Sequence, residues 1–172
     1  MSNLSAEEKL TLFDRHVNAE LEGDLATTMA TMSEHPHLVS VPTMAGGDGF
    51  QEVKDFYQNH LVGKFFPPGI EFVQVSRTVG ETQIVDEVIL KFTHTAVMDW
   101  MLPNIPPTNK PVEIGVVVIV GLENNKITHE HIYWDQASVL VQVGLLDPTN
   151  LPVCGVGAAR KILNPKLKGP LF

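Results

Sequence analysis

Cysteine is almost missing from this chain of 172 residues, which contains only Cys154. One cysteine cannot form a disulfide within the chain, and it cannot supply the several thiolates of a cysteine-based zinc site. The fold must therefore be held by core packing. A chain of this length can bury roughly 70% of the surface that its unfolded form exposes, which is enough for one stable domain.

Basic residues are few as well. The chain has 12 Lys and Arg against 20 Asp and Glu, and its formal net charge is −8. The basic residues are scattered, apart from a short run at residues 160–168. Nucleic acids and anionic membranes are recognised through concentrated positive charge, so we expect neither as a partner.

Long hydrophobic runs are also lacking. The longest, at residues 115–121, is far shorter than the roughly 20 apolar residues of a membrane-spanning helix. The first ten residues do not combine a basic start with an apolar stretch, which is the pattern of a secretory signal peptide. These features predict a cytoplasmic protein.

The spacing of apolar residues divides the chain into a helical part and a part made of strands. Apolar residues at helical spacing predict three helices, at residues 5–23, 24–32 and 49–62, with a short strand between the last two. Ser5 and Glu8 have the spacing of a capping box at the start of the first helix. From residue 70 the period becomes two, which predicts strands at residues 70–79, 82–98, 112–122 and 126–136. A short helix follows Asp135.

Helices segregated from strands in this way predict an α+β fold. Three N-terminal helices packed on one face of a strongly curved antiparallel sheet would form a cone that encloses a pocket. We expect this domain to span residues 1–146. Residues 147–172 are rich in proline and are expected to form an extended C-terminal arm.

The most informative stretch is KITHEHIYWDQASVLVQVG, at residues 126–144. Side chains alternate along a strand, so one face of it carries His129, His131, Tyr133 and Asp135. Such a polar row is costly to bury without partners. It indicates either a pocket that moves protons or a wet outer face.

Three short motifs carry a resemblance to a known family: Thr93-His94-Thr95 followed by the segment PPTNKPV at residues 106–112, Asn125-Lys126-Ile127, and Asp135 with Gln142-Val143-Gly144 seven residues on. In this order they resemble the SnoaL-like polyketide cyclase group of the NTF2-like (cystatin-like α+β barrel) superfamily. The resemblance covers about residues 5–146. It implies the same α+β cone.

The resemblance also implies a cofactor-free enzyme that acts on a small, apolar, carbonyl-bearing molecule of polyketide type. The studied cyclases close a ring by an intramolecular aldol step, with an aspartate of the last strand as acid/base. Asp135 matches that aspartate, and His94 matches the pocket histidine. The superfamily also contains isomerases, dehydratases, epoxide hydrolases and members without catalysis, and these remain alternatives.

The polar row on residues 129–135 and the family resemblance together give the candidate site residues. Asp135, His94 and His131 are expected to be catalytic; the expected substrate-binding residues are Tyr133, Tyr57, Trp100 and Phe92. Asp135 directly precedes a helix, so an N-terminal cap is the alternative role for it. His131 would lie about 13 Å from Asp135 along a flat strand, at ~3.3 Å per residue.

Two further groupings are weaker. Histidines two positions apart on a strand point the same way and could share a metal ion, as in the pairs His35 with His37 and His129 with His131. No acidic or cysteine partner stands at a diagnostic distance, so no metal is expected. Arg77, Asp86 and Asp99 could form an Asp-Arg-Asp group of the epoxide-hydrolase kind, although their strand phases do not clearly converge.

The expected assembly is a homodimer. An apolar stripe on the third of the four long strands, made of Val116, Val118 and Val120, offers a surface for a second copy of the chain.

Overall fold

The computed structural model describes residues 4–61 and 66–169, and within these ranges the fold is α+β, as the sequence predicted. The helices are α1 (Ala6–Glu22), α2 (Leu25–Thr31), α3 (Phe50–Phe56), α4 (Gln136–Gln142) and α5 (Val156–Leu163). A π-helical turn, Tyr57–Leu61, continues α3. The predicted end of this third helix, Val62, lies outside the described residues. The strands are β1 (Met32–Ser40), β2 (Ala45–Asp48), β3 (Glu71–Val79), β4 (Gln83–Thr93), β5 (Pro111–Glu123) and β6 (Lys126–Trp134).

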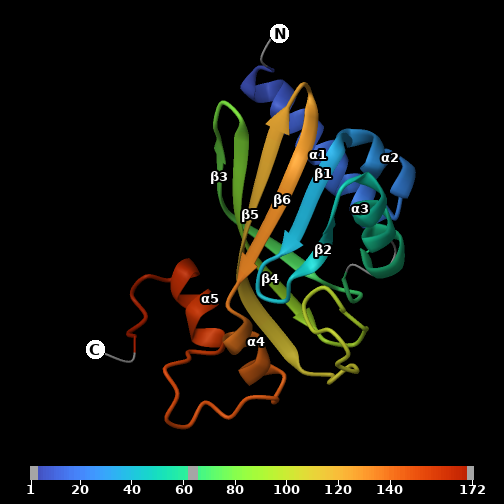
Figure 1. Ribbon diagram of the computed structural model, residues 1–172. Coiled ribbons are helices and arrows are strands. Elements are labelled where there is room, and N and C mark those ends of the chain that lie inside the picture. The colour runs from blue at the N-terminus through green and yellow to red at the C-terminus, as the bar shows by residue number, and fades with distance from the viewer. Residues whose placement is uncertain (1–3, 62–65, 170–172) are drawn as a thin grey trace.

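The described strands form one curved, open sheet in the order β2-β1-β6-β5-β4-β3. All neighbours are antiparallel except β1, which lies parallel to β6. The four long strands β3 to β6 are antiparallel, as predicted, and the earlier strand β1 adds one parallel pair with β6. Figure 1 shows α1, α2 and α3 grouped beside β1 and β2, with α4 and α5 at the opposite end of the molecule. No helix among the described residues has both the length and the apolar character needed to cross a bilayer.

Helix α1 begins as its sequence predicts. The Ser5 hydroxyl accepts a hydrogen bond from the Glu8 backbone N–H at 3.2 Å, and the Glu8 carboxylate accepts from the Ser5 N–H at 2.8 Å. Gly23 ends the helix with φ 78°, a left-handed conformation that favours glycine. The buried face of α1 carries Phe13, but it also carries His16 and Glu20. Two ionisable residues on the buried face of a helix require partners.

The apolar stripe of β5 faces the helices and not a second copy of the chain. Val116 and Val120 are buried in the core, and Val118 lines the internal cavity described below. The expectation that this stripe forms a dimer surface was therefore wrong, because alternation alone does not say which face of a strand is the inner one. The homodimer itself stays a prediction.

The C-terminal segment is not extended throughout. Residues 156–163 form α5, which packs on the outer face of β5, where Ile162 lies against Gly115. An ion pair between Arg160 Nη2 and Glu113 Oε1, at 2.6 Å, ties α5 to the same strand. The prediction of an extended arm was wrong for this helix, whose apolar residues find a surface on β5. The domain boundary at residue 146 stays a prediction.

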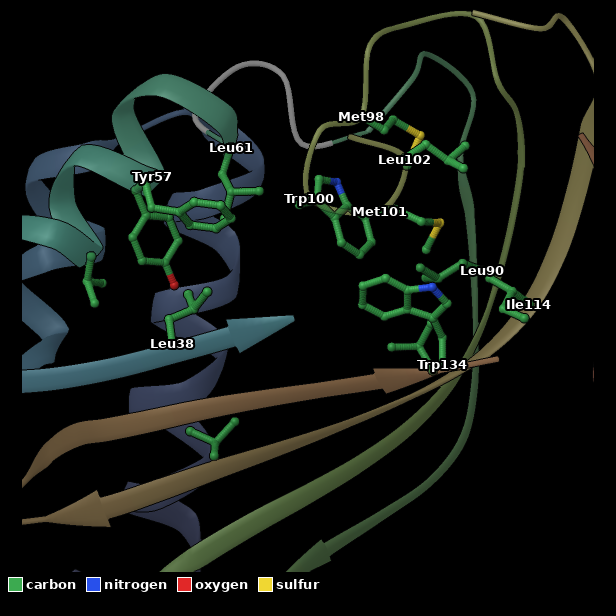
Figure 2. Packing of buried hydrophobic residues seen from close by; sticks show 14 of the residues in the cluster. Leu38, Tyr57, Leu61, Leu90, Met98, Trp100, Met101, Leu102, Ile114 and Trp134 are labelled. Carbon is green, nitrogen blue, oxygen red and sulfur yellow. The ribbon is translucent and has the colours of Figure 1, made fainter. Parts of the chain in front are cut away.

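The long loop between β4 and β5 closes one end of the cone. Its side chains Met98, Trp100, Met101 and Leu102 are almost fully buried. Figure 2 shows Trp100 and Met101 above Trp134 of β6, and the two indole rings meet edge to face with centroids 5.3 Å apart. This loop supplies an aromatic wall to the interior.

Candidate functional site

A cavity of about 390 Å³ lies between α1 and the inner face of the sheet. This volume falls in the range of small-molecule sites. Most of its lining is apolar or aromatic, and its polar side chains are Glu20, Gln74, Arg77, Asp86 and Glu130. A wider groove of about 1100 Å³ runs past α2, β1 and β6, but it is open to solvent. We take the smaller cavity beside α1 as the candidate site because buried ionisable groups face it.

One part of the cavity wall is a buried hydrogen-bonded network of four residues. His16 and Glu20 come from α1, Tyr57 from the turn after α3, and Glu130 from β6. Tyr57 donates its hydroxyl proton to Glu130 Oε2 at 2.7 Å. His16 Nε2 lies 3.1 Å from Glu20 Oε1 and 3.4 Å from Glu130 Oε1. Figure 2 shows the Tyr57 hydroxyl directed from its helical turn toward the sheet.

The hydrogen bonds around His16 define its protonation. The Thr31 hydroxyl donates to the Thr28 carbonyl, so its oxygen accepts a proton from His16 Nδ1, at 2.6 Å. The other ring nitrogen, Nε2, faces the two carboxylates and the Tyr57 oxygen, at 3.2 Å. All of these are acceptors once Tyr57 donates to Glu130. With both carboxylates ionised, His16 carries protons on both nitrogens and is an imidazolium.

The network moves the pKa values of its members in different directions. Burial works against the charged form of His16, but the charges and hydrogen bonds of Glu130 and Glu20 outweigh it and raise the pKa of His16 well above its usual value. Burial raises the pKa of Glu20, and His16 only partly offsets that effect. Burial also acts on Glu130, but the charge of His16 and hydrogen bonds from His16 and Tyr57 lower the pKa of Glu130. Two carboxylates with divergent pKa values are the usual mark of an acid/base pair.

These shifts predict how stability depends on pH. His16 and Glu20 bind protons more tightly in the folded state, so they contribute stability at low pH that is lost as the pH rises toward their folded pKa values. We expect the free energy of unfolding to fall as the pH rises above about 6.5, the ordinary value for histidine. Urea denaturation at several pH values measures this fall. The slope should be reduced in His16→Gln and unchanged in His35→Gln, an exposed histidine of β1. Equal slopes in all three proteins would contradict the assignment.

A second polar group lines the cavity on β3 and β4. Arg77 and Asp86 lie opposite each other on the paired strands. They form a bidentate ion pair with N–O distances of 3.0 and 2.8 Å. Gln74 also donates to Asp86, and Arg77 reaches Asp14 of α1 at 2.9 Å. The Asp-Arg-Asp group considered from the sequence was wrong in Asp99, because Arg77 pairs with Asp86 and with Asp14. Asp99 instead faces His60, at 3.5 Å.

Asp135 lies outside the cavity. It is exposed at the N-terminus of α4, where its carboxylate accepts from the Ser138 backbone N–H at 3.1 Å and from the Ser138 hydroxyl at 2.6 Å. This is the capping role that the sequence left open. The expected place of Asp135 in a pocket that moves protons was wrong, because its carboxylate is exposed at the start of α4.

Substitution at Asp135 distinguishes a cap from a catalytic group. Asp135→Ala should lose about 1 kcal/mol of stability, because it removes the cap. Asp135→Asn should lose little, because asparagine caps as well as aspartate. Both variants should keep the ligand binding and any activity of the wild type. Loss of activity in a stably folded Asp135→Asn would contradict this account.

His131 and Tyr133 point away from the cavity. The inner face of β6 carries Glu130 and Ile132, which line the cavity, and the buried Trp134. The sequence analysis divided the residues of β6 correctly between its two faces. It expected the face with His131 and Tyr133 to line the pocket, and the opposite face does so. The reason is that Glu130 is buried with compensation from His16 and Tyr57, which strand alternation does not show.

His94 and Phe92 are buried, but neither is among the residues that line the cavity. His94 Nδ1 accepts from the Thr108 backbone N–H at 3.3 Å, which holds the loop after β4 against the segment before β5. Its Nε2 finds no hydrogen-bond partner among the described residues. Burial lowers the pKa of His94, which favours the neutral ring.

Two predicted residues belong to the site. Trp100 lines the cavity, and Tyr57 anchors the network. The residues that the sequence analysis missed are His16, Glu20 and Glu130. A signal for the first two was available, since they are spaced by four on the same helix face as the apolar Phe13.

The same three residues could also hold a metal ion. One ligand atom each from His16, Glu20 and Glu130 lies within 4.8 Å of the others. A divalent ion would replace the proton on His16 Nε2 and would be neutralised by the two carboxylates. His16 donates its other N–H to Thr31, as metal-binding histidines commonly do to an outer partner. The donor set therefore fits either a proton or a metal ion between the carboxylates.

Comparisons with known proteins place this geometry in a known fold. No protein-family model matches the chain, and no curated protein sequence matches it either. Solved structures do match. A protein from Jannaschia sp. CCS1 classed as a SnoaL-like polyketide cyclase is 19% identical with TM-score 0.60, over 82% of this chain and 92% of that one. An NTF2-like protein of unknown function from Burkholderia pseudomallei K96243 is 15% identical with TM-score 0.59, over 81% and 98%.

A third match is a protein with a ketosteroid isomerase-like fold from Catenulispora acidiphila DSM 44928, solved in complex with trimethylamine. It is 12% identical with TM-score 0.57, over 78% of this chain and 93% of that one. At these identities the matches identify the fold. The chain has the NTF2-like fold that SnoaL-like and ketosteroid isomerase-like proteins share, and this confirms the prediction from the sequence motifs.

Proposed function

We propose that this chain is an enzyme that moves a proton on a small, largely apolar, carbonyl-bearing molecule held in the cavity, as an isomerase or a cyclase does. The observation that supports the proposal is the pair Glu20 and Glu130, whose pKa values are pushed in opposite directions at the wall of an apolar cavity. SnoaL-like and ketosteroid isomerase-like proteins share the fold. The proposed chemistry uses side chains of the protein alone.

Glu20 is the proposed proton carrier. A general acid or base works best when its pKa lies near the working pH, and burial moves the pKa of Glu20 in that direction. Glu130 is less suited to that role, because Tyr57 holds one of its oxygens and His16 faces the other. Glu130 and His16 instead form a pair of charges beside Glu20. Burial has the largest effect on the pKa of Glu20 and raises it, while His16 lowers this pKa and Glu130 raises it further.

The proposed reaction begins when ionised Glu20 takes a proton from the carbon beside the carbonyl. The C–H bond breaks, and its electron pair moves toward the carbonyl oxygen to form an enolate. Arg77, which lines the cavity, is the proposed partner for that developing charge. In an isomerase, Glu20 returns the proton to a different carbon. In a cyclase, the enolate carbon attacks a second carbonyl of the same molecule, and Glu20 protonates the new alkoxide.

Deuterium exchange tests the proposal without knowledge of the natural substrate. Purified protein is incubated in D2O with small cyclic, aromatic and polyketide-like ketones, and mass spectrometry follows deuterium entry beside the carbonyl. At least one ketone should exchange faster with native protein than with heat-denatured protein. A ketone that binds in the cavity, as followed by ligand-observed NMR, but exchanges at the buffer rate would indicate a binding module and contradict the proposal.

Hydrolysis is the second candidate, and the Arg77–Asp86 pair favours it. Asp86 is 8% exposed, lines the cavity and is held at both oxygens by Arg77, so it could orient or deprotonate a water molecule. Product mass separates the candidates, because isomerisation and cyclisation conserve mass, dehydration removes one water and hydrolysis adds one. A gain of one water from an epoxide, with no exchange on ketones, would favour this candidate over the first.

A further inference from the structure

A second cluster of ionisable side chains lies on the outer face of the sheet, away from the cavity. It contains His37 of β1 together with His129 and His131 of β6. The parallel pairing of these strands places His37 directly beside His129 and Val39 beside His131. Side chains of paired residues point to the same face, so the three imidazoles share one side of the sheet. We call this group the outer histidine cluster.

His131 is the central member of the outer histidine cluster. Its Nε2 lies 3.3 Å from Nδ1 of His37, and the two rings meet edge to face with centroids 5.2 Å apart. The ring of His129 also lies against His131, with centroids 4.6 Å apart and a tilt of 32°. All three side chains are half-buried, so each is held by its neighbours and remains reachable from solvent.

Gly121 of β5 makes room for this arrangement. It is the register partner of His129, and the imidazole lies directly over it. A Cβ atom at Gly121 would stand 2.1 Å from Cε1 of His129, closer than any two such atoms can approach. The bare backbone of β5 therefore lets the His129 ring lie flat against the sheet, beside His131.

Two members of the outer histidine cluster, His129 and His131, favour the neutral imidazole. Burial, followed by the nearby histidines, lowers the pKa values of His129 and His131. Among the described contacts of the three rings there is no ion pair with a carboxylate. Neutral imidazole nitrogen is the commonest protein ligand of zinc-like ions. Two nitrogens of a tetrahedral zinc site with bonds of 2.0–2.1 Å stand about 3.3 Å apart, which is the separation of His37 Nδ1 and His131 Nε2.

We propose that the outer histidine cluster binds a divalent transition-metal ion of the zinc class. His37 Nδ1 and His131 Nε2 are the preformed ligands, and His129 becomes the third by rotation of its side chain. Water completes the coordination, as in three-histidine sites generally. The sequence showed only the pair on β6 and the separate pair on β1. What it lacked was the parallel contact of β1 with β6, which brings His37 to His131.

Calorimetric titration of the metal-stripped full chain with Zn²⁺ or Ni²⁺ tests the proposal. One ion should bind at the outer histidine cluster, and His37→Ala and His131→Ala should each weaken this binding by roughly tenfold or more, because loss of only an outer partner of a metal-bound histidine already costs 10- to 100-fold. The matched control is His35→Ala, which removes an exposed histidine of the same strand and should bind as the wild type does. Long-range ¹⁵N NMR should show the largest shifts at His37 Nδ1 and His131 Nε2.

A further control separates this site from the buried network. Glu20→Gln removes a possible ligand inside the cavity and should leave binding at the outer histidine cluster unchanged. Binding that persists in His131→Ala and disappears in Glu20→Gln would overturn the proposal, and so would the absence of binding at millimolar metal. Neither result depends on whether the chain exchanges protons on ketones, because the two sites occupy opposite faces of the sheet.

Discussion

Replacement of Glu20 by glutamine is expected to lower deuterium exchange on a responsive ketone by about 100- to 10,000-fold, the usual contribution of a positioned acid or base. Glutamine is nearly the same size but cannot carry the proton. Glu20 is 8% exposed and lines the cavity, so the change acts at the surface that a bound molecule would touch. The exchange rate of the variant, followed by mass spectrometry, measures the effect.

Glu22→Gln is the matched control for this experiment. Glu22 lies two residues away on the same helix and is exposed, so the control removes the same charge from α1 without touching the cavity. Its exchange rate should equal that of the wild type. If Glu20→Gln exchanges as fast as Glu22→Gln while both remain folded, Glu20 is not the proton carrier and the proposed mechanism fails.

Replacement of His16 by alanine is expected to destabilise the fold by about 3–5 kcal/mol at neutral pH, the usual cost of breaking a buried ion pair. His16 is fully buried and is the cation between Glu20 and Glu130. Without it, two buried carboxylates share one site, and one of them must take up a proton. Urea denaturation followed by circular dichroism measures the loss of stability.

A second substitution shows whether charge causes that loss. His16→Ala combined with Glu130→Gln removes the cation and one anion together, so the double variant should be less destabilised than the sum of the two single variants. His35→Ala should stay within about 0.5 kcal/mol of the wild type, since its side chain is exposed. A similarly small change in His16→Ala would mean that no buried cation is needed between the carboxylates.

Much of the fold was predictable because local signals agree with the global structure. The capping box of Ser5 and Glu8 opens α1, and the change of period near residue 70 marks the start of β3 and of the four long strands that follow one another. The cone and its pocket followed from the order of the elements. The motifs that indicated the NTF2-like fold include Thr93 and His94, which lie at the end of β4 and in the loop after it.

The site was harder to predict, for a physical reason. Strand alternation pairs Glu130 with Trp134 on one face and His131 with Tyr133 on the other, but it does not say which face is inside. Glutamate is rarely buried alone, so the histidine face looked like the better pocket wall. In the structure the Glu130 face is the inner one, because the positive charge of His16 stabilises the buried carboxylate. His16 lies on a helix more than a hundred residues away in the chain, so a local pattern could not show this contact.

The outer histidine cluster depends on a contact that periodicity cannot show. His37 and His131 are 94 residues apart, and they meet only because β1 lies parallel to β6 while every other described pair is antiparallel. A local pattern predicts a strand but not its neighbour or its direction. The same limit explains why Asp14, and not Asp99, completes the group around Arg77.

The central claim is that Glu20 and Glu130 hold their protons with different strength inside the cavity wall. Carbon-13 NMR of the glutamate carboxyl carbons across a pH titration tests it most directly. The claim predicts that the Glu20 signal titrates above the ordinary glutamate value of 4.5 and the Glu130 signal below it, while His16 stays protonated past neutral pH. Titration of both carboxylates together near 4.5, with His16 neutral at pH 7, would contradict it.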